Sequence, residues 1–281
     1  MSWIEPISTT ISVAEITSKI VESSGRLKKN WERLLYFVQH GSLVIPMFGA
    51  GGVGKSTMSR IIAGENPLSL LAPYDESMRV ESVALTGNIP GRILVAPGQE
   101  ARIDRHWPEL LEQLNKRKAV GLLNIVSYGY HSSSLESIHD YDVYKEGMST
   151  PDFVRAYLEH RRKREVALLR ELVVGLSGIR KPLWMMTVVN KQDLWWSNRD
   201  SVRKYYIEGE YSHLLDELTA KVGARNFQHE YLPASLTLGN FRTPAGEILA
   251  ETCAGYDQLT HLRYYENLLN KVYELGAHQE R

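Results

Sequence analysis

The stretch SLVIPMFGAGGVGKST, residues 42–57, decides the fold of this protein. Its first part, Ser42–Phe48, is a short apolar run of the kind that forms a buried strand. Its second part, Gly49–Thr57, combines glycines with one lysine and two hydroxyl side chains. Glycine lets the backbone turn back tightly, so that consecutive N–H groups face one concavity suited to an anion. The stretch therefore predicts a strand that leads into a phosphate-binding loop.

The loop matches the pattern G-x-x-x-x-G-K-[ST] in full over residues 49–56. Chance gives such a match in about one chain of this length in a hundred, and the flanking strand and helix make chance rarer still. A helix that begins near Lys55 would point its positive end at a bound phosphate. We expect Lys55 to act in catalysis by reaching the β- and γ-phosphates, and the Ser56 hydroxyl to coordinate Mg²⁺. The predicted phosphate-binding residues are Gly49, Gly51, Gly52, Val53, Gly54, Lys55, Ser56 and Thr57.

Composition narrows the class of protein. The 281 residues are enough for one large domain or for a domain with an appendage. Lys and Arg together number 33, as do Asp and Glu, and the resulting zero net charge argues against a nucleic-acid partner. The single cysteine, Cys253, fits a reducing compartment, and the N-terminus lacks the features of a signal peptide. No stretch reaches the roughly 18 apolar residues of a membrane span. We expect a cytoplasmic protein without a transmembrane segment.

Apolar runs alternate with helical patterns after the phosphate loop. Alternation of this kind is typical of α/β proteins, in which crossover helices link parallel strands. We therefore predict a mostly parallel sheet with helices on both faces. The predicted strands after the first are RVESVAL (79–85), GRILVA (91–96), Ala119–Tyr130, Pro182–Asn190 and His229–Ser235. The predicted helices include Lys55 to about Ala63, a long helix over 151–174 and a final helix over about Tyr256–Leu275.

The boundaries of these patterns suggest an extension and an insertion. Residues 1–40 have apolar residues at helical spacing and predict an N-terminal helical extension. Residues 41–281 would then form the phosphate-loop domain. Within it, residues 131–150 predict an inserted loop before the long helix, because the distance between neighbouring motifs is too great for one strand and one helix.

The long helix has a clear start. Thr150 is the predicted N-cap, Pro151 suits the first helical position, and Asp152 places an acid in the first turn. The run HRRKRE, residues 160–165, lies inside this helix and predicts a charged, solvated face. His131, at the start of the inserted loop, is expected to be an ordinary loop residue and not a metal ligand.

A second motif, Asn190–Asp193 (NKQD), follows an apolar strand. Four-residue patterns recur by chance in a few per cent of chains, but this one leaves the carboxyl end of a predicted strand, where α/β proteins bind ligands. Asp193 can accept hydrogen bonds from N1–H and the 2-amino group of guanine, and adenine offers neither donor there. Lys191 can cover the base face, and Asn190 can tie this motif to the phosphate loop. In PAS, residues 233–235, a backbone N–H could reach guanine O6, although small-residue turns after strands are common. The predicted base-binding residues are Asn190, Lys191, Asp193, Ala234 and Ser235.

The order of these motifs resembles that of the Ras-like P-loop GTPases over about residues 43–235. GAGGVGKS is similar to the first motif of that family, PGQE (97–100) to the third, NKQD to the fourth and Ala234-Ser235 to the fifth. The resemblance implies a small-GTPase fold, GTP or GDP with Mg²⁺ as cofactors, and hydrolysis of GTP. It also implies that Gly98 senses the γ-phosphate and that Gln99 orients the attacking water. The alternative for Gln99 is a solvated loop residue.

This sequence departs from the family in two motifs. The third motif is usually D-x-x-G-Q, and Val95 stands at the aspartate position. A subset of bacterial small GTPases, including those related to gliding-motility polarity switches, looks similar in this respect, and the chain is placed nearest to that group. The switch threonine of the second motif is also missing, because no threonine lies between Thr57 and Thr86. Ser77 and Arg79 are candidates for metal ligand and charge stabiliser, or are ordinary loop residues.

Three functions are compatible with these residues. The first is a GTP-binding switch that hydrolyses GTP slowly, with a protein partner as effector or activator. The second is a GTP-loaded interaction module with little or no hydrolysis, since Val95 weakens the metal site. The third is a P-loop ATPase or kinase with an accidental N-K-x-D. The pair Trp195-Trp196 after the base motif could anchor a partner, but core packing beneath the base loop is favoured.

Overall fold

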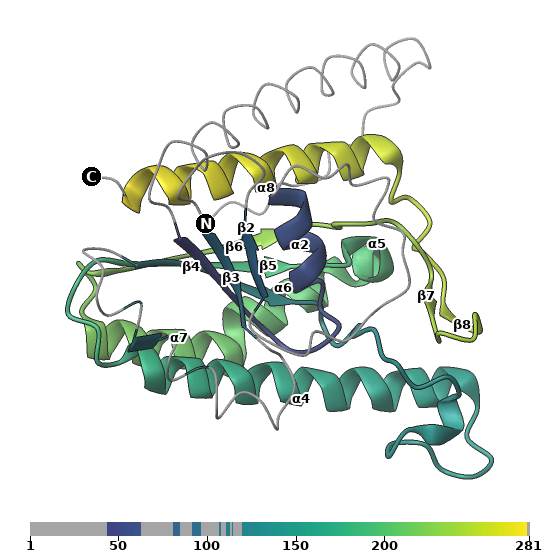
Figure 1. Ribbon diagram of the computed structural model, residues 1–281. Coiled ribbons are helices and arrows are strands. Elements are labelled where there is room, and N and C mark those ends of the chain that lie inside the picture. Colours follow the sequence, from purple (N-terminus) through teal and green to yellow (C-terminus); the bar gives the residue numbers. More distant parts are fainter. Residues whose placement is uncertain are drawn as a thin grey trace.

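A sheet of six strands organises the part of the chain that the structure describes. The computed structural model describes residues 44–62, 81–84, 92–96, 107, 111–112, 114 and 120–279. The strands are β1 (Val44–Phe48), β2 (Glu81–Ala84), β3 (Arg92–Val95), β4 (Val120–Val126), β5 (Leu183–Val189) and β6 (Phe227–Pro233). They lie in the order β2-β3-β1-β4-β5-β6 (Figure 1). Only β2 runs antiparallel to its neighbour in this sheet, so the mostly parallel sheet predicted from the sequence is confirmed.

The apolar runs become central strands because both faces of the sheet are covered. In β5, LWMMTVV, every residue except Trp184 is buried. A strand that packs on both faces needs apolar side chains at consecutive positions, so it lacks the alternation of a half-exposed strand. The predicted strand to Tyr130 is shorter in the structure and ends at Val126. The reason is that the N–H groups of Ser127 and Gly129 turn away from the sheet and donate to the Glu165 carboxylate.

Helices cover both faces of the sheet, as predicted. The helices are α2 (Lys55–Ile62), α4 (Thr150–Leu176), α5 (Gln192–Trp195), α6 (Arg199–Glu208), α7 (Glu210–Val222) and α8 (Gln258–Gln279). Figure 1 shows α8 along one face of the sheet, with α4 and α7 along the opposite face. The chain also forms two single turns of 3₁₀ helix, Ile138–Asp140 and Trp196–Asn198.

The start of α4 differs by one residue from the prediction. Ser149, and not Thr150, is the N-cap, because its backbone is extended and its hydroxyl accepts a hydrogen bond from the Asp152 N–H at 3.3 Å. Thr150 is therefore the first helical residue, with Pro151 inside the first turn. Both residue types suit these positions, since a serine oxygen satisfies an unpaired N–H group of the helix and proline there loses no hydrogen bond.

Sequence patterns did not predict α6, α7 or the hairpin of β7 (Phe241–Arg242) and β8 (Ile248–Ala250). The helical pattern is nevertheless present in α7, where the buried residues follow a spacing of three and four. The buried residues of α7 are Tyr211, Leu214, Leu215, Leu218 and Val222. Figure 1 shows the hairpin at the end of the molecule where α4 begins.

Several predictions fall on residues outside the described part of the chain. They are the helical extension over 1–40, the switch candidates Ser77 and Arg79, and the third-motif residues Gly98 and Gln99. The predicted insertion over 131–150 lies wholly within the described residues, and it contains one 3₁₀ turn before α4 begins. Among the described helices, none combines the length and the apolar character that a membrane crossing requires.

Candidate nucleotide-binding site

Those predicted site residues that the structure describes meet at one edge of the sheet. The phosphate loop leaves the carboxyl end of β1, the base motif leaves β5, and Ala234-Ser235 follow β6. Parallel strands place all their carboxyl ends at the same edge. The chain order also reverses beside β1, which has β3 on one side and β4 on the other. Such a reversal is where open α/β sheets bind ligands. Fold topology therefore brings together motifs that lie far apart in the sequence.

The phosphate loop needs glycine where the loop after β4 approaches it. Gly52 has φ +76°, in the left-handed region, and a β-carbon there would lie 2.0 Å from the Ser132 carbonyl oxygen. Gly49 has φ +132°, and a β-carbon would lie 2.1 Å from the Ile125 carbonyl oxygen. Any side chain at either position would collide with backbone atoms that cannot move aside. The glycines therefore let β4 and its following loop pack directly on the phosphate loop.

The Lys55 ammonium lies over the phosphate loop. Lys55 is the first residue of α2 and is 7% exposed. Its Nζ donates to the carbonyl oxygens of Gly49 at 2.9 Å and Ala50 at 2.7 Å. These bonds hold the charge against the concave backbone, which is the position from which it can meet a phosphate oxygen.

Ser56 follows in the first turn of α2 and is partly buried. Mg²⁺ in nucleotide sites takes few protein ligands, because phosphate oxygens and water supply the rest. Within the described ranges, no group of three His, Cys, Asp or Glu side chains is arranged to hold a metal ion.

Asn190 connects the phosphate loop to the base motif. Its side chain is buried, with 3% exposure. Its Nδ2 donates to the Val53 carbonyl oxygen at 2.7 Å, and its Oδ1 accepts from the Leu236 N–H at 3.0 Å. A carbonyl can only accept and an N–H can only donate, so these partners determine which end of the amide is nitrogen. The predicted tie between the two motifs is present, and it extends to the segment after β6.

Asp193 is a buried carboxylate with two protein donors. It is 1% exposed, its Oδ1 accepts from the Ser235 hydroxyl at 2.6 Å, and its Oδ2 accepts from the Gly239 N–H at 3.2 Å. Burial raises the pKa of Asp193, and the hydrogen bonds from Ser235 and Gly239 oppose that shift. The same Ser235 oxygen accepts from the Asp193 N–H at 2.9 Å. Ser235 therefore orients the aspartate of the base motif.

Ala234 directly follows β6 and is bonded to β5 and to the base motif. Its N–H donates to the Val189 carbonyl oxygen at 3.0 Å, which continues the pairing of β5 with β6. The Ala234 amide is therefore already paired within the sheet, and a backbone N–H of residues 233–235 that reaches guanine O6 stays a prediction. Ala234 instead supports the base motif through its carbonyl oxygen, which accepts from the Gln192 N–H at 3.1 Å.

Lys191 has a left-handed backbone, and its side chain extends to the loop after β4. Its φ is +59°, and its Nζ donates to the Ser132 hydroxyl oxygen at 2.9 Å. The same nitrogen lies 5.8 Å from the centre of the Phe241 ring. The ammonium is withdrawn from water, which lowers the pKa of Lys191 to about 8. The lysine thus connects the base motif to the loop after β4, and this contact was not predicted from the sequence.

The tryptophan pair packs inside the protein, as predicted. Trp195 is fully buried, and its Nε1 donates to the Asn190 carbonyl oxygen at 2.8 Å. Trp196 is 7% exposed and packs edge-on against Tyr256 and Tyr264, with ring centres 5.4 and 5.8 Å apart. Both rings therefore support the base motif from the core.

The interpretation of residues 160–165 as a charged face is wrong for Glu165. This side chain is buried and accepts hydrogen bonds from the loop after β4 and from Tyr206. His131, expected to be an ordinary loop residue, is also buried, and its Nε2 lies 2.9 Å from the Glu165 Oε1. The helical spacing contained the signal, because Glu165 is four residues from Leu169 and eight from Tyr157, both on the buried face of α4.

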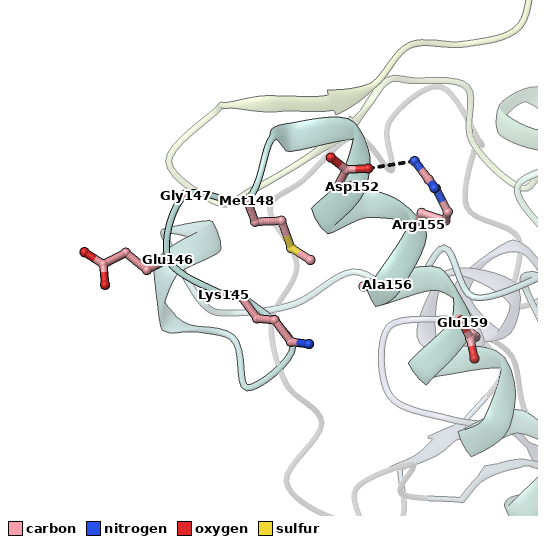
Figure 2. Close-up of a pocket in the computed structure, with 8 residues that line it drawn as sticks. All are labelled: Lys145, Glu146, Gly147, Met148, Asp152, Arg155, Ala156 and Glu159. Atoms are coloured by element: carbon pink, nitrogen blue, oxygen red, sulfur yellow. Dashed lines mark hydrogen bonds and ion pairs between the residues drawn. The ribbon is translucent and has the colours of Figure 1, made fainter.

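A separate pocket lies at the start of α4. Figure 2 shows this pocket, which has a volume of about 460 Å³, with Asp152 and Arg155 paired at 2.7 Å on one side. None of the predicted nucleotide-site residues lines it. Its lining residues are Lys145, Glu146, Gly147, Met148, Asp152, Arg155, Ala156 and Glu159.

Comparisons with known proteins give only distant similarity. No protein-family model matches the sequence, and the curated proteins contain no match. Among solved structures, the mammalian SRP receptor matches with 13% identity and a TM-score of 0.44 over 82% of this chain and 99% of that chain. The small COPII coat GTPase SAR1 from Encephalitozoon cuniculi, in complex with GDP, matches with 11% identity and a TM-score of 0.40 over 92% and 93%. Toc33 from Arabidopsis thaliana, in complex with GDP and Mg²⁺, matches with 15% identity and a TM-score of 0.41 over 93% and 92%. Similarity at this level assigns no activity to the chain.

Proposed function

We propose that this protein binds a guanine nucleotide and hydrolyses GTP slowly, acting as a molecular switch. The observation that carries the proposal is the Asn190 side chain, which bonds Val53 in the phosphate loop and Leu236 beyond β6. One buried amide thereby couples the part of the site that suits phosphates to the part that suits a base. A chance glycine-rich turn would have no reason to be joined to an N-K-x-D motif in this way.

The preference for guanine rests on Asp193. An ionised carboxylate has about four positions for hydrogen-bond donors. Ser235 donates one hydrogen bond to Oδ1 of Asp193, and Gly239 donates one to Oδ2, so each oxygen can accept a further donor. Guanine would supply N1–H and the 2-amino group. Adenine would leave the buried carboxylate without these donors, and the cost of that loss would make the site reject adenine nucleotides.

The proposed chemistry is transfer of the γ-phosphoryl group to water. Lys55 and the backbone of the phosphate loop would neutralise charge on the phosphates, and Ser56 would be the protein ligand of a nucleotide-borne Mg²⁺. Gln99 would orient the attacking water and Gly98 would contact the γ-phosphate. These two roles rest on the sequence resemblance, as does placement near the bacterial group with a similar third motif.

Slow turnover follows from Val95. The register of β3 pairs Val95 with Met47, so β3 ends beside the strand that leads into the phosphate loop. An acidic residue at this position could accept from water bound to Mg²⁺, whereas valine cannot. The same observation favours a second candidate function, a GTP-loaded interaction module with little or no hydrolysis. In both cases the nucleotide would control binding of a protein partner.

The test begins with the purified full chain and its bound nucleotide. Denaturing the protein and separating the released nucleotides should yield GDP or GTP in preference to adenine nucleotides. Titration with fluorescent GDP, GTP and ATP analogues should give tight binding of the first two only. Binding of ATP alone, or of no nucleotide, would overturn the proposal. A single-turnover assay with Mg²⁺ then separates the slow enzyme from the non-hydrolysing module.

A further inference from the structure

The loop after β4 contacts both halves of the candidate site. In this loop, the Ser132 N–H donates to the Gly52 carbonyl oxygen in the phosphate loop at 3.0 Å. The Ser132 hydroxyl oxygen accepts from Nζ of Lys191 in the base motif at 2.9 Å. One residue thus bonds the phosphate loop through its backbone and the base motif through its side chain. β4 lies between β1 and β5 in the sheet, so this loop emerges between the two motifs (Figure 1).

Buried Glu165 holds this loop in place. Its Oε1 accepts from the N–H of Ser127 at 2.8 Å and of Gly129 at 3.2 Å, and from Nε2 of His131 at 2.9 Å. Its Oε2 accepts from the Tyr206 hydroxyl at 2.7 Å. One carboxylate on α4 therefore collects donors from three positions of the loop and from α6.

The residue directly before Ser132 is held from two sides. The His131 side chain contacts Glu165, and the His131 carbonyl oxygen accepts from the Tyr157 hydroxyl at 2.6 Å. Both partners lie on α4. The Ser132 backbone consequently has little freedom to move away from Gly52, and the hydroxyl stays within reach of Lys191.

We propose that Ser132 is a positioning residue for nucleotide retention, and that Glu165 acts through the loop 127–132 to set its place. The proposal rests on the proposed function. Ser132 holds the Lys191 ammonium in one position against the phosphate loop, so that the phosphate and base sub-sites keep the spacing that one nucleotide requires. A site that is already arranged loses less conformational freedom on binding, and its ligand leaves more slowly. Glu165 touches no nucleotide in this arrangement.

The first experiment measures release of a fluorescent GDP analogue from the full chain by stopped-flow displacement. Ser132→Ala removes the acceptor of Lys191 and should accelerate release roughly 10-fold, the size expected for one hydrogen bond to a charged group. The melting temperature without nucleotide should fall less than in Glu165→Gln, because the alanine keeps the backbone bond to Gly52 and loses a single side-chain bond. Ser132→Thr keeps the hydroxyl and should restore slow release.

Ser133→Ala is the matched control. Ser133 lies in the same loop, and its hydroxyl oxygen accepts from the Leu135 N–H at 3.2 Å and not from Lys191. Its removal should leave the release rate unchanged. Equal release rates for wild type and Ser132→Ala, or equal acceleration by Ser132→Ala and Ser133→Ala, would overturn the proposal.

The second experiment tests the link to Glu165 by a double-mutant cycle. Glu165→Gln should accelerate release and lower the melting temperature. In the Ser132→Ala background, Glu165→Gln should still lower the melting temperature but add little to the release rate. The reason is that the hydrogen bond between Ser132 and Lys191, which Glu165 helps to position, is already absent. Additive effects on release would show that Glu165 acts on general stability only. If Glu165→Gln does not fold, Tyr206→Phe removes one donor to the same carboxylate and replaces it in the cycle.

These outcomes separate the two proposals. A chain that binds no guanine nucleotide contradicts the proposed function. A chain that binds GDP tightly but releases it at the same rate with or without the Ser132 hydroxyl leaves the proposed function intact and contradicts the role of Ser132.

Discussion

The Asn190 side-chain nitrogen lies 2.7 Å from the Val53 carbonyl oxygen, although the two residues are 137 positions apart in the chain. This bond fixes the base motif against the phosphate loop. Asn190→Asp replaces the donor by a carboxylate oxygen facing the carbonyl, and it should lower the free energy of unfolding by about 1–3 kcal/mol, the cost of a buried unsatisfied group. Nucleotide affinity should fall with it. Urea unfolding and a nucleotide titration measure the two effects. Asn198→Asp, at an exposed asparagine, should change neither.

Lys55→Ala should abolish tight nucleotide binding. The Lys55 ammonium lies within 2.9 Å of two phosphate-loop carbonyl oxygens and is the side-chain charge that we place against the phosphates. Loss of a charge-assisted bond to phosphate should weaken GDP roughly 100-fold or more in a fluorescence titration. Lys204→Ala removes an exposed lysine of α6 and is the matched control. Affinity that is equal in the two variants would contradict the phosphate-loop assignment.

Asp193→Asn should exchange base specificity. Xanthine carries a carbonyl where guanine has its 2-amino group, so the new amide can donate to the base instead of accepting from it. The Ser235 hydroxyl, 2.6 Å from Asp193 Oδ1, can donate or accept and therefore tolerates the amide. We expect weaker GTP binding and stronger binding of xanthosine triphosphate, measured by competition. A variant that keeps its GTP affinity and gains nothing for the xanthine analogue would place the base elsewhere.

GTP hydrolysis by the isolated chain should be slow, on the order of 10⁻⁴ per second, as for an unassisted Ras-type enzyme, or slower. Val95 offers no acceptor to the water shell of the metal. Gln99→Leu should reduce the rate further and leave nucleotide affinity nearly intact, because the glutamine would act in the transition state. Single-turnover hydrolysis with Mg²⁺ compares the two proteins. Fast GTP hydrolysis at a rate that Gln99→Leu does not change would mean that another residue positions the water.

The protein should lose stability as the pH falls below about 6.5. Burial lowers the pKa of His131 from 6.5, so the unfolded chain takes up a proton that the buried ring resists. This contribution to stability is complete above pH 6.5 and is lost as the pH falls toward the lower, folded-state pKa. Its slope is about 1.4 kcal/mol per pH unit. Urea unfolding of His131→Gln at several pH values should show a shallower slope than the wild type. His139→Gln, at an exposed histidine, should keep the wild-type slope.

Much of the fold could be predicted because it depends on local patterns. The apolar run before Gly49 and the run in β5 become strands at the predicted places, and Pro151 marks the first turn of α4. Glu165 was assigned wrongly because it stands in a run of charged residues that predicts a surface. Its spacing from Tyr157 and Leu169 places it on the buried face of α4, and the packing of α4 against the loop after β4 makes it an acceptor. Ser132 carries no sequence signal, because its partners Gly52 and Lys191 belong to two distant motifs.

The sequence by itself determined the chemical groups of the candidate site: the glycine loop with Lys55 and Ser56, and the carboxylate of Asp193. These groups follow from residue type and short spacing, and neither depends on the tertiary structure. The tertiary structure alone decided how they meet. The parallel sheet brings the ends of β1, β4, β5 and β6 to one edge, where Asn190 reaches Val53 and Ser132 reaches Lys191. It also decided that the Ala234 N–H pairs within the sheet, since β5 and β6 remain hydrogen-bonded up to that residue. Contacts of this kind arise from strand order and helix packing, and no short stretch of sequence contains both partners.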